Sequence, residues 1–206
     1  MVDFQSRDRR DTRREPETDD DEEDAPAEQA SEPDATEETG EETTAPEEIE
    51  DAAGVGVAVV VVDEDPSDDD PAGTAVAEAL YEAGYDVVAS EFLRKDYDGV
   101  QSALDALVSR DDVAVVVTAG GTGLTAADVT IEAAHPLFEK VLPGFGELFR
   151  DRYAEQVGTA VVSTRATAGI ADGVPVFCLP GEAAAARLGA ADIVAPEAVD
   201  IVARLE

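Results

Sequence analysis

Cysteine, histidine and lysine are scarce in this sequence, and each scarcity excludes a kind of structure or site. The single cysteine, Cys178, cannot form a disulfide framework, and its place in an apolar run indicates a buried, inert thiol. The single histidine, His135, has no cysteine or histidine partner for a metal site, so we interpret it as a surface or packing residue. The only lysines are Lys95 and Lys140, so the side chains of this sequence offer only two ammonium groups.

Long apolar runs are also missing, as are two common nucleotide-binding motifs. The longest apolar run, residues 55–62, is far shorter than a membrane span, and the N-terminus is polar. Neither a membrane anchor nor a secretion signal is indicated, and we expect a cytoplasmic protein. No Gly-Lys-Ser or Gly-Lys-Thr follows the glycine-rich stretch, which excludes a Walker motif, and the spacing of dinucleotide-binding turns is absent.

Acidic residues dominate the N-terminal segment. Residues 1–53 hold 22 Asp or Glu against five Arg, with very few large apolar residues. Such a segment cannot bury enough surface to offset the entropy lost on ordering, so we expect a disordered acidic tail followed by one folded domain over residues 54–206. The arginines cluster between Arg7 and Arg14, but the acidic run at 19–24 would compete with phosphate, so nucleic acid is not the expected partner.

The expected domain is itself strongly acidic. Residues 54–206 carry 27 acids and nine Lys or Arg, so the acid excess is a property of the whole chain. This composition resembles that of proteins from a salt-saturated cytoplasm, and it indicates a haloarchaeon-like halophile. A specific basic partner is the alternative, but the acids are scattered over every predicted surface.

Short apolar runs alternate with amphipathic segments in the domain. This βαβαβ order predicts a three-layer α/β/α fold with a mostly parallel sheet and right-handed crossovers. Asp98 is the expected cap of the second helix, and the segment 159–169 is ambiguous between strand and helix. The expected strands are 55–62, 85–90, 113–117, 174–179 and 192–194, and the expected helices are 74–83, 98–107, a short one within 131–141, 147–157, 183–188 and 197–205, with a turn at 143–146.

The most informative stretch, residues 113–130, reads VAVVVTAGGTGLTAADVT. A buried strand leads directly into Gly120, Gly121 and Gly123, which leave backbone N–H groups uncovered and permit turns that other residues resist. In open α/β sheets, ligands bind beyond the carboxyl ends of the strands. The loop therefore indicates either a phosphate-bearing ligand or a plain strand-to-helix turn. Pro180 and Gly181 follow another strand and precede a helix, which predicts a second phosphate-binding position.

Several motifs occur together in a recognisable order. TAGGTG is followed by Asp128-Val129-Thr130, then by PGFGELFR at 143–150, by TRATAG at 164–169 and by Leu179-Pro180-Gly181. This set resembles the molybdenum-cofactor biosynthesis family known as MogA/MoaB, the molybdopterin-binding domain, over roughly residues 54–205. Such proteins have a three-layer α/β fold and assemble as trimers or hexamers.

The resemblance also implies a chemistry. Active family members transfer AMP from Mg-ATP to the terminal phosphate of molybdopterin and release pyrophosphate. Phosphoryl chemistry of this kind depends on positioning and charge neutralisation, so the absence of a Ser-His-Asp set is no objection. The partners implied are a pterin, a nucleotide and further copies of the chain.

Site residues follow from the resemblance and from the glycine-loop argument together. The resemblance implies catalytic roles for Asp128, Asp63 and Asp96, with Asp128 as the Mg²⁺ ligand, and a helix start at Asp70 and Gly73. The expected substrate and phosphate contacts are Thr118, Gly120, Gly121, Thr122, Gly123, Thr164, Arg165, Pro180 and Gly181.

Three departures from the family pattern bear on activity. Ala127 stands where the family usually has Arg, which removes a cation from the phosphate site. Glu182 replaces the Ser of Leu-Pro-Gly-Ser-Pro and brings a carboxylate to a place where an anion would dock. Leu93-Arg94-Lys95-Asp96 replaces a Val-Pro-Asp-Asp signature, and we expect Arg94 or Lys95 to be a candidate source of the missing charge.

Alternatives remain open for several residues and for the function. Arg165 contacts phosphate or forms a structural salt bridge, and Asp128 binds Mg²⁺ or caps the helix that follows it. Glu147 and Arg150 form a surface pair or contribute to the site or a trimer interface. The functional hypotheses are a molybdopterin adenylyltransferase, a binding module that no longer adenylylates, and a pure assembly protein.

Overall fold

The computed structural model describes residues 52–205. The expected tail, residues 1–53, lies outside this range except for its last two residues, of which Ala52 is fully buried. The elements in chain order are β1 (Gly56–Asp63), α1 (Pro71–Glu82), β2 (Asp86–Arg94), α2 (Tyr97–Val108), β3 (Val115–Ala119), α3 (Thr130–Ala134), a 3₁₀ turn (His135–Leu137), β4 (Lys140–Val141), α4 (Pro143–Val157), a 3₁₀ segment (Gly158–Ser163), β5 (Thr167–Ala171), β6 (Val174–Leu179), α5 (Ala183–Gly189), a π-helical turn (Ala190–Val194) and α6 (Ala195–Ala203).

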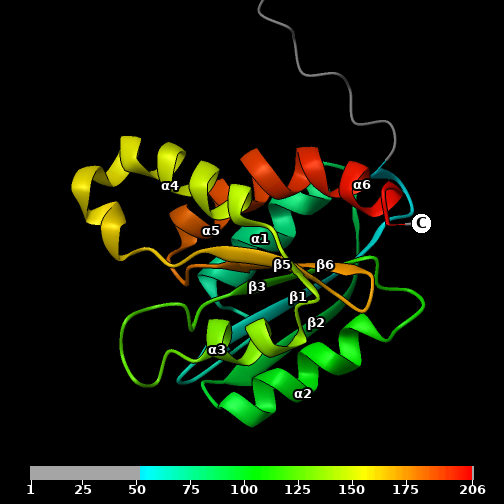
Figure 1. Cartoon of the computed structure of the whole chain (residues 1–206), viewed down its shortest axis with the longest axis horizontal. Coiled ribbons are helices and arrows are strands. Elements are labelled where there is room, and N and C mark those ends of the chain that lie inside the picture. Colours follow the sequence, from blue (N-terminus) through cyan, green and yellow to red (C-terminus); the bar gives the residue numbers. More distant parts are fainter. Residues whose placement is uncertain (1–51, 206) are drawn as a thin grey trace, which may run out of the picture. The chain divides into compact units, whose positions relative to one another are not determined.

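The strands form one mixed sheet in the order β2-β1-β3-β6-β5-β4. The strands β2, β1, β3 and β6 run parallel, whereas β5 is antiparallel to both β6 and β4. Helices α1, α4, α5 and α6 cover one face of the sheet, and α2 and α3 cover the other (Figure 1). The predicted three-layer α/β/α fold with a mostly parallel sheet is therefore confirmed.

Strand β1 shows why the apolar runs are continuous rather than alternating. Val57 and Val59 pack into the core beneath α1, whereas Ala58, Val60 and Val62 pack into the core beneath α2. A strand with helices on both faces must be apolar at every position, because neither set of side chains meets water. The aromatic anchors lie in the first of these cores, where Phe145 and Phe177 pack edge to face with ring centroids 5.2 Å apart.

Two helix starts differ in how well the sequence predicted them. Asp70 caps α1 by accepting hydrogen bonds from the amides of Ala72 and Gly73, each at 2.9 Å, which confirms the expected helix start. The cap of α2 is Asp96 rather than Asp98, and its carboxylate accepts from the amide of Gly99 at 2.8 Å. The expectation for Asp98 was wrong because β2 runs on to Arg94, which leaves Asp96 as the extended residue before the helix.

Residues 143–146, expected as a turn, form the first turn of α4. Proline is well suited to the first helical position, because its missing N–H has no partner there and its φ is already helical. The glycines that suggested a turn have another reason: a Cβ on Gly146 would lie 2.8 Å from the carbonyl oxygen of Ala166. Close packing against the segment before β5 accounts for that glycine.

Two further expectations were wrong about strands. Residues 192–194 belong to a π-helical turn that joins α5 to α6, and their apolar members are buried with Ala190 and Ala198 at helical spacing. Lys140 and Val141, expected in a helical segment, form the edge strand β4. The ambiguous segment 159–169 divides into a 3₁₀ segment and β5.

No helix within residues 52–205 is long and apolar enough to cross a membrane. The expectation of a cytoplasmic protein stays a prediction.

Candidate functional site

Four strands bring their carboxyl ends to one edge of the sheet. Asp63 at the end of β1 is in register with Arg94 at the end of β2, and Ala119 at the end of β3 is in register with Leu179 at the end of β6. The loops that follow these strands therefore start side by side. The expected site residues are drawn from these loops and from the segment before β5.

The glycine loop after β3 turns sharply, and two of its glycines are required by geometry. Gly120 and Gly121 have φ values of 101° and 64°, which side chains rarely adopt. A Cβ at Gly120 would lie 2.2 Å from the carbonyl oxygen of Val62, and one at Gly121 would lie 2.1 Å from Oγ1 of Thr130. The loop is thus pressed against the end of β1 and the start of α3.

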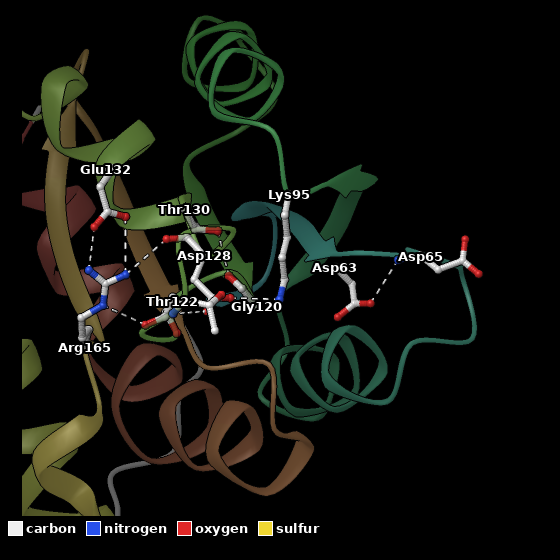
Figure 2. Close-up of polar contacts among 10 residues, drawn as sticks. Asp63, Asp65, Lys95, Gly120, Thr122, Asp128, Thr130, Glu132 and Arg165 are labelled. Carbon is white, nitrogen blue, oxygen red and sulfur yellow. Dashed lines mark hydrogen bonds and ion pairs between the residues drawn. The ribbon is translucent and has the colours of Figure 1, made fainter.

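The first residue of α3 holds the loop from the other side. The amide of Thr130 donates to the carbonyl oxygen of Gly121 at 3.0 Å, and its hydroxyl donates to that of Gly120 at 2.8 Å (Figure 2). Within residues 52–205, the amides of Gly121, Thr122 and Gly123 donate no hydrogen bond to the protein. Three adjacent backbone donors therefore have no acceptor among the described residues, and their contact with a ligand stays a prediction.

Asp128 closes the same loop. Its Oδ2 accepts from the amide of Thr125 at 3.0 Å and from the hydroxyl of Thr125 at 2.6 Å. Its Oδ1 lies 2.9 Å from the ammonium of Lys95, and only 8% of the Asp128 side chain is exposed. The hydrogen bonds from Thr125, together with Lys95, lower the pKa of Asp128 from its usual 3.8 to about 2. Helix α3 is preceded by Val129 and has no side-chain cap, so Asp128 does not cap that helix.

Lys95 places a positive charge against Asp128. It follows β2, where its amide donates to the carbonyl oxygen of Asp63 at 3.2 Å. The hydrogen bond to Asp128 raises the pKa of Lys95, against a smaller opposing effect of burial. Arg94, the other candidate, is 75% exposed and lies near Asp65 at 3.7 Å, so it contributes nothing to the glycine loop.

The contacts of Asp128 decide whether it fits the expected Mg²⁺. Both carboxylate oxygens already accept hydrogen bonds, and the ammonium of Lys95 neutralises the charge. Within residues 52–205, no group of three or more His, Cys, Asp or Glu could hold a metal ion. Mg²⁺ is bound by hard oxygen ligands with near-ideal octahedral geometry, and a carboxylate in an ion pair is a poor candidate. The residues at this edge do not fit a protein-held Mg²⁺ in the arrangement seen.

Arg165 ties the glycine loop to α3 and to the segment before β5. Its guanidinium donates to the carbonyl oxygen of Thr122 at 3.1 Å and to that of Asp128 at 3.4 Å (Figure 2). It also pairs with Glu132 of α3 at 2.6 Å, and this hydrogen bond lowers the pKa of Glu132. The geometry thus gives Arg165 the structural salt bridge that was one of its two expected roles, and contact with phosphate stays a prediction.

A pocket of about 240 Å³ opens beside the loop. One side of it is polar and the other carries Val157 and Ala160. Tyr153 of α4 donates to Oε2 of Glu182 at 2.7 Å within it. Burial, and then this hydrogen bond, raises the pKa of Tyr153 to about 12. The pocket is lined by Thr122, Gly123, Tyr153, Val157, Ala160, Ser163, Thr164, Arg165, Pro180 and Glu182.

The expected site residues separate into two groups. Thr122, Gly123, Thr164, Arg165 and Pro180 line the pocket. Gly120, Gly121 and Gly181 lie close to pocket residues in the sequence but do not line the pocket, and a Cβ on Gly181 would lie only 3.1 Å from Cα of Gly120.

The remaining expected residues do not line the pocket. Thr118 is fully buried in β3, where its hydroxyl has no hydrogen-bond partner in the described part of the chain. Asp63 is exposed and accepts from the amide of Asp65, and Asp96 serves as a helix cap. The single thiol belongs to Cys178 of β6, which is in register with Thr118 of β3. Burial raises the pKa of Cys178 to about 12.

Glu132 and Tyr153 were missed as site residues. The hydroxyl of Tyr153 reaches the pocket, where it meets Glu182 at the start of α5. Lys95, which the sequence had offered with Arg94 as a candidate source of charge, lies against the carboxylate that closes the glycine loop.

The comparisons with known proteins identify the family of this chain. A family model described as "Probable molybdopterin binding domain" matches residues 39–199. The chain belongs to this molybdopterin-binding domain family. The resemblance seen in the sequence motifs is thereby confirmed, whereas the haloarchaeon-like origin stays a hypothesis.

Relatives in the family are molybdenum cofactor biosynthesis proteins. Molybdenum cofactor biosynthesis protein B of Bacillus subtilis is 37% identical over 145 residues, which cover 70% of this chain and 85% of that protein. The protein of the same name from Bacillus anthracis is 40% identical over 140 residues, covering 68% and 83%.

Solved structures of family members have the same fold. A crystal structure of molybdenum cofactor biosynthesis protein B matches with a TM-score of 0.70 and 37% identity, covering 78% of this chain and 98% of that one. The tungsten cofactor synthesizing protein MoaB from Pyrococcus furiosus matches with a TM-score of 0.67 and 37% identity, covering 73% and 96%.

Proposed function

We propose that this chain binds molybdopterin in the pocket beside the glycine loop, as part of molybdenum cofactor biosynthesis. The observation that carries the proposal is the set of backbone amides at Gly121, Thr122 and Gly123, which have no protein acceptor in the described residues. Thr122 and Gly123 line the pocket. Clustered backbone N–H groups bind anions, and the terminal phosphate of molybdopterin is an anionic group. The apolar wall at Val157 and Ala160 suits the flat pterin ring.

The volume and charge of the pocket set limits on the ligand. A pocket of about 240 Å³ has room for part of a pterin and its phosphate, with the remainder in solvent. Glu182 is the anionic group of the pocket wall and opposes a phosphate, whereas Lys95 and Arg165 lie close to the loop and favour one. The phosphate is therefore proposed to lie at the loop, and the ring toward α4.

A binding experiment tests this proposal. Ala160→Trp fills the pocket without touching the glycine loop, and Ala106→Trp on the exposed face of α2 is the matched control. Because the chain has no Trp, each variant also provides a single fluorophore. We expect equilibrium dialysis in molar KCl to show molybdopterin bound to the wild type and to Ala106→Trp but not to Ala160→Trp. Equal binding by all three proteins would refute the pocket.

Adenylylation of molybdopterin with Mg-ATP is the second candidate function. It is supported by an ionised carboxylate, Asp128, in the loop between β3 and α3, and by the family to which the chain belongs. The ion pair between Asp128 and Lys95 weighs against it, since this pairing removes the expected Mg²⁺ ligand. The geometry therefore favours the binding function over the transferase.

Pyrophosphate release separates these two functions. Incubation with molybdopterin and Mg-ATP in molar KCl is expected to yield bound molybdopterin and little pyrophosphate. Robust release would establish the transferase, and Asp128→Asn should then lower turnover by orders of magnitude if the carboxylate acts on the metal.

Assembly into trimers or hexamers, and a cytoplasmic location, are proposed with the function. Sedimentation in molar KCl measures the number of chains in the assembly. A monomer at all concentrations would remove the assembly proposal without affecting the binding one.

A further inference from the structure

Lys95 is held in place at both its backbone and its side chain. Its amide donates a hydrogen bond to the carbonyl oxygen of Asp63 at the end of β1, and its ammonium lies 2.9 Å from Oδ1 of Asp128. The Lys95 side chain is 19% exposed, so most of its stem is covered while the charged end keeps some access to solvent. An ammonium in this setting is a fixed charge rather than a mobile surface group.

The ammonium of Lys95 has more N–H donors than its contacts use. A lysine ammonium carries three N–H donors, and within residues 52–205 only Asp128 accepts one of them. Asp63, which Figure 2 shows on the side of Lys95 away from Arg165, and Glu64 also act on the charge of Lys95, so the cation has acidic surroundings. Two donors are thus available to a further acceptor at the sheet edge.

Asp128 connects this cation to the pocket. A Cβ on Gly123 would lie 2.5 Å from Oδ2 of Asp128, so the loop wall lies directly against the carboxylate. Its other oxygen faces Lys95. The Asp128 carboxylate thus lies between the ammonium of Lys95 and Gly123 of the glycine loop. The charge of Lys95 acts on an anion at the loop across this one side chain.

We propose that Lys95, held by Asp128, supplies the positive charge for a terminal phosphate at the glycine loop, so that this phosphate binds without a divalent cation. The inference rests on the proposed function, which supplies the ligand, and it identifies the positive charge that binds the phosphate of that ligand. A divalent ion at Asp128 would have to displace the ammonium and the two donors of Thr125. The ammonium of Lys95 already pairs with the Asp128 carboxylate and still has N–H donors for a phosphate.

The experiment compares ligand affinity with and without metal. Inorganic phosphate and molybdopterin share the terminal phosphate and are titrated separately into the wild type in molar KCl, once with EDTA and once with Mg²⁺. The test variant is Lys95→Met, and the control is Lys140→Met, which removes the other lysine from the exposed strand β4. Lys95→Arg keeps the charge, and the double variant Lys95→Met with Asp128→Asn avoids an unpaired buried carboxylate if the single variant does not fold.

We expect wild-type dissociation constants for both ligands to agree within about twofold between EDTA and Mg²⁺. Loss of a hydrogen bond from a charged donor should weaken binding about tenfold or more in Lys95→Met and in the double variant. Lys140→Met should match the wild type, and Lys95→Arg should lie between.

The outcomes separate the two proposals. Molybdopterin binding that requires Mg²⁺, or that is unaffected in the double variant, overturns the role of Lys95 and leaves the pocket standing. Lys95-dependent binding of inorganic phosphate without any binding of molybdopterin overturns the proposed function and supports the role of Lys95. Binding of neither ligand overturns both.

Discussion

Asp128 illustrates how one side chain acquires its properties from its neighbours. Its carboxylate is almost fully buried, yet it stays ionised because Thr125 donates two hydrogen bonds and Lys95 supplies the opposite charge. Removing one partner of such a buried pair leaves the other without compensation, which costs more than the pair contributes as a unit. The same three contacts close the glycine loop, so the stability of the residue and the shape of the loop are linked.

The first prediction concerns the pH dependence contributed by Asp128. Its pKa falls from 3.8 to about 2 on folding, so its stabilisation is present above the unfolded value and is lost as pH falls through about 2. We expect Asp128→Asn to lower the free energy of unfolding by about 2 kcal/mol at pH 7, with the deficit shrinking between about pH 4 and pH 2. Urea unfolding in molar KCl measures both quantities. The exposed Asp105→Asn is the control, and a deficit independent of pH would contradict the assignment.

The element that organises the site is the connection between β3 and α3. It leaves the sheet through two glycines of positive φ and is held at its far end by Thr130. Arg165, from a segment more than 30 residues away in sequence, holds it from the side through Thr122. A loop fixed at three points presents its amides in one arrangement, which lowers the entropic cost of binding an anion.

A pair of glycine substitutions tests this account. A Cβ at Gly120 would meet the backbone of Val62 at 2.2 Å, and its φ of 101° is unfavourable for alanine. We expect Gly120→Ala to destabilise the protein by about 2 kcal/mol or more and to abolish ligand binding. Gly144, in the first turn of α4, has nothing within 4 Å of its Cβ position. Gly144→Ala should therefore be neutral or stabilising by about 0.5 kcal/mol. Thermal and urea unfolding compare the two, and equal effects would argue against a special role for the loop glycine.

At the scale of the whole molecule, charge is the dominant feature. The expected domain has three acids for every Lys or Arg, and the described ion pairs engage only a few of the acids. Most carboxylates therefore repel one another across the surface. The proposal of adaptation to high salt follows from this imbalance.

Salt should consequently stabilise the fold. We expect the melting temperature to rise between about 0.1 M and molar KCl, because repulsion among close carboxylates is poorly screened at the lower ionic strength. Circular dichroism at matched protein concentration measures the change. A melting curve that does not move over this range would contradict the halophilic hypothesis.

The N-terminal segment provides a second test at this scale. Its composition offers almost nothing to pack, and the buried Ala52 lies beyond residue 50. We expect deletion of residues 1–50 to leave the melting temperature unchanged within error at fixed salt. A fall of several degrees would show that the segment contributes to the folded domain.

Local sequence was sufficient where a short-range pattern reports a local geometry. The apolar strands β1, β3 and β6 were predictable because a strand buried on both faces is apolar throughout. Apolar spacing predicted α1 from residue 74, and the family resemblance at Asp70 and Gly73 indicated its true start. The glycine loop was predictable because only glycine tolerates its backbone. By contrast, Pro143-Gly144-Phe145-Gly146 was ambiguous, since the same residues suit a turn or a helix start.

The sequence alone determined the family, the layered fold and the position of the glycine loop, because these depend on patterns of neighbouring residues. Tertiary structure decided the partners of each charge. Lys95 meets Asp128, Arg165 meets Glu132, and Tyr153 meets Glu182 across separations of about 30 residues or more in sequence. No local pattern specifies such pairs, because they form only when parallel strands bring their carboxyl ends to one edge. For that reason the sequence predicted a metal ligand at Asp128, whereas the folded chain places a lysine there.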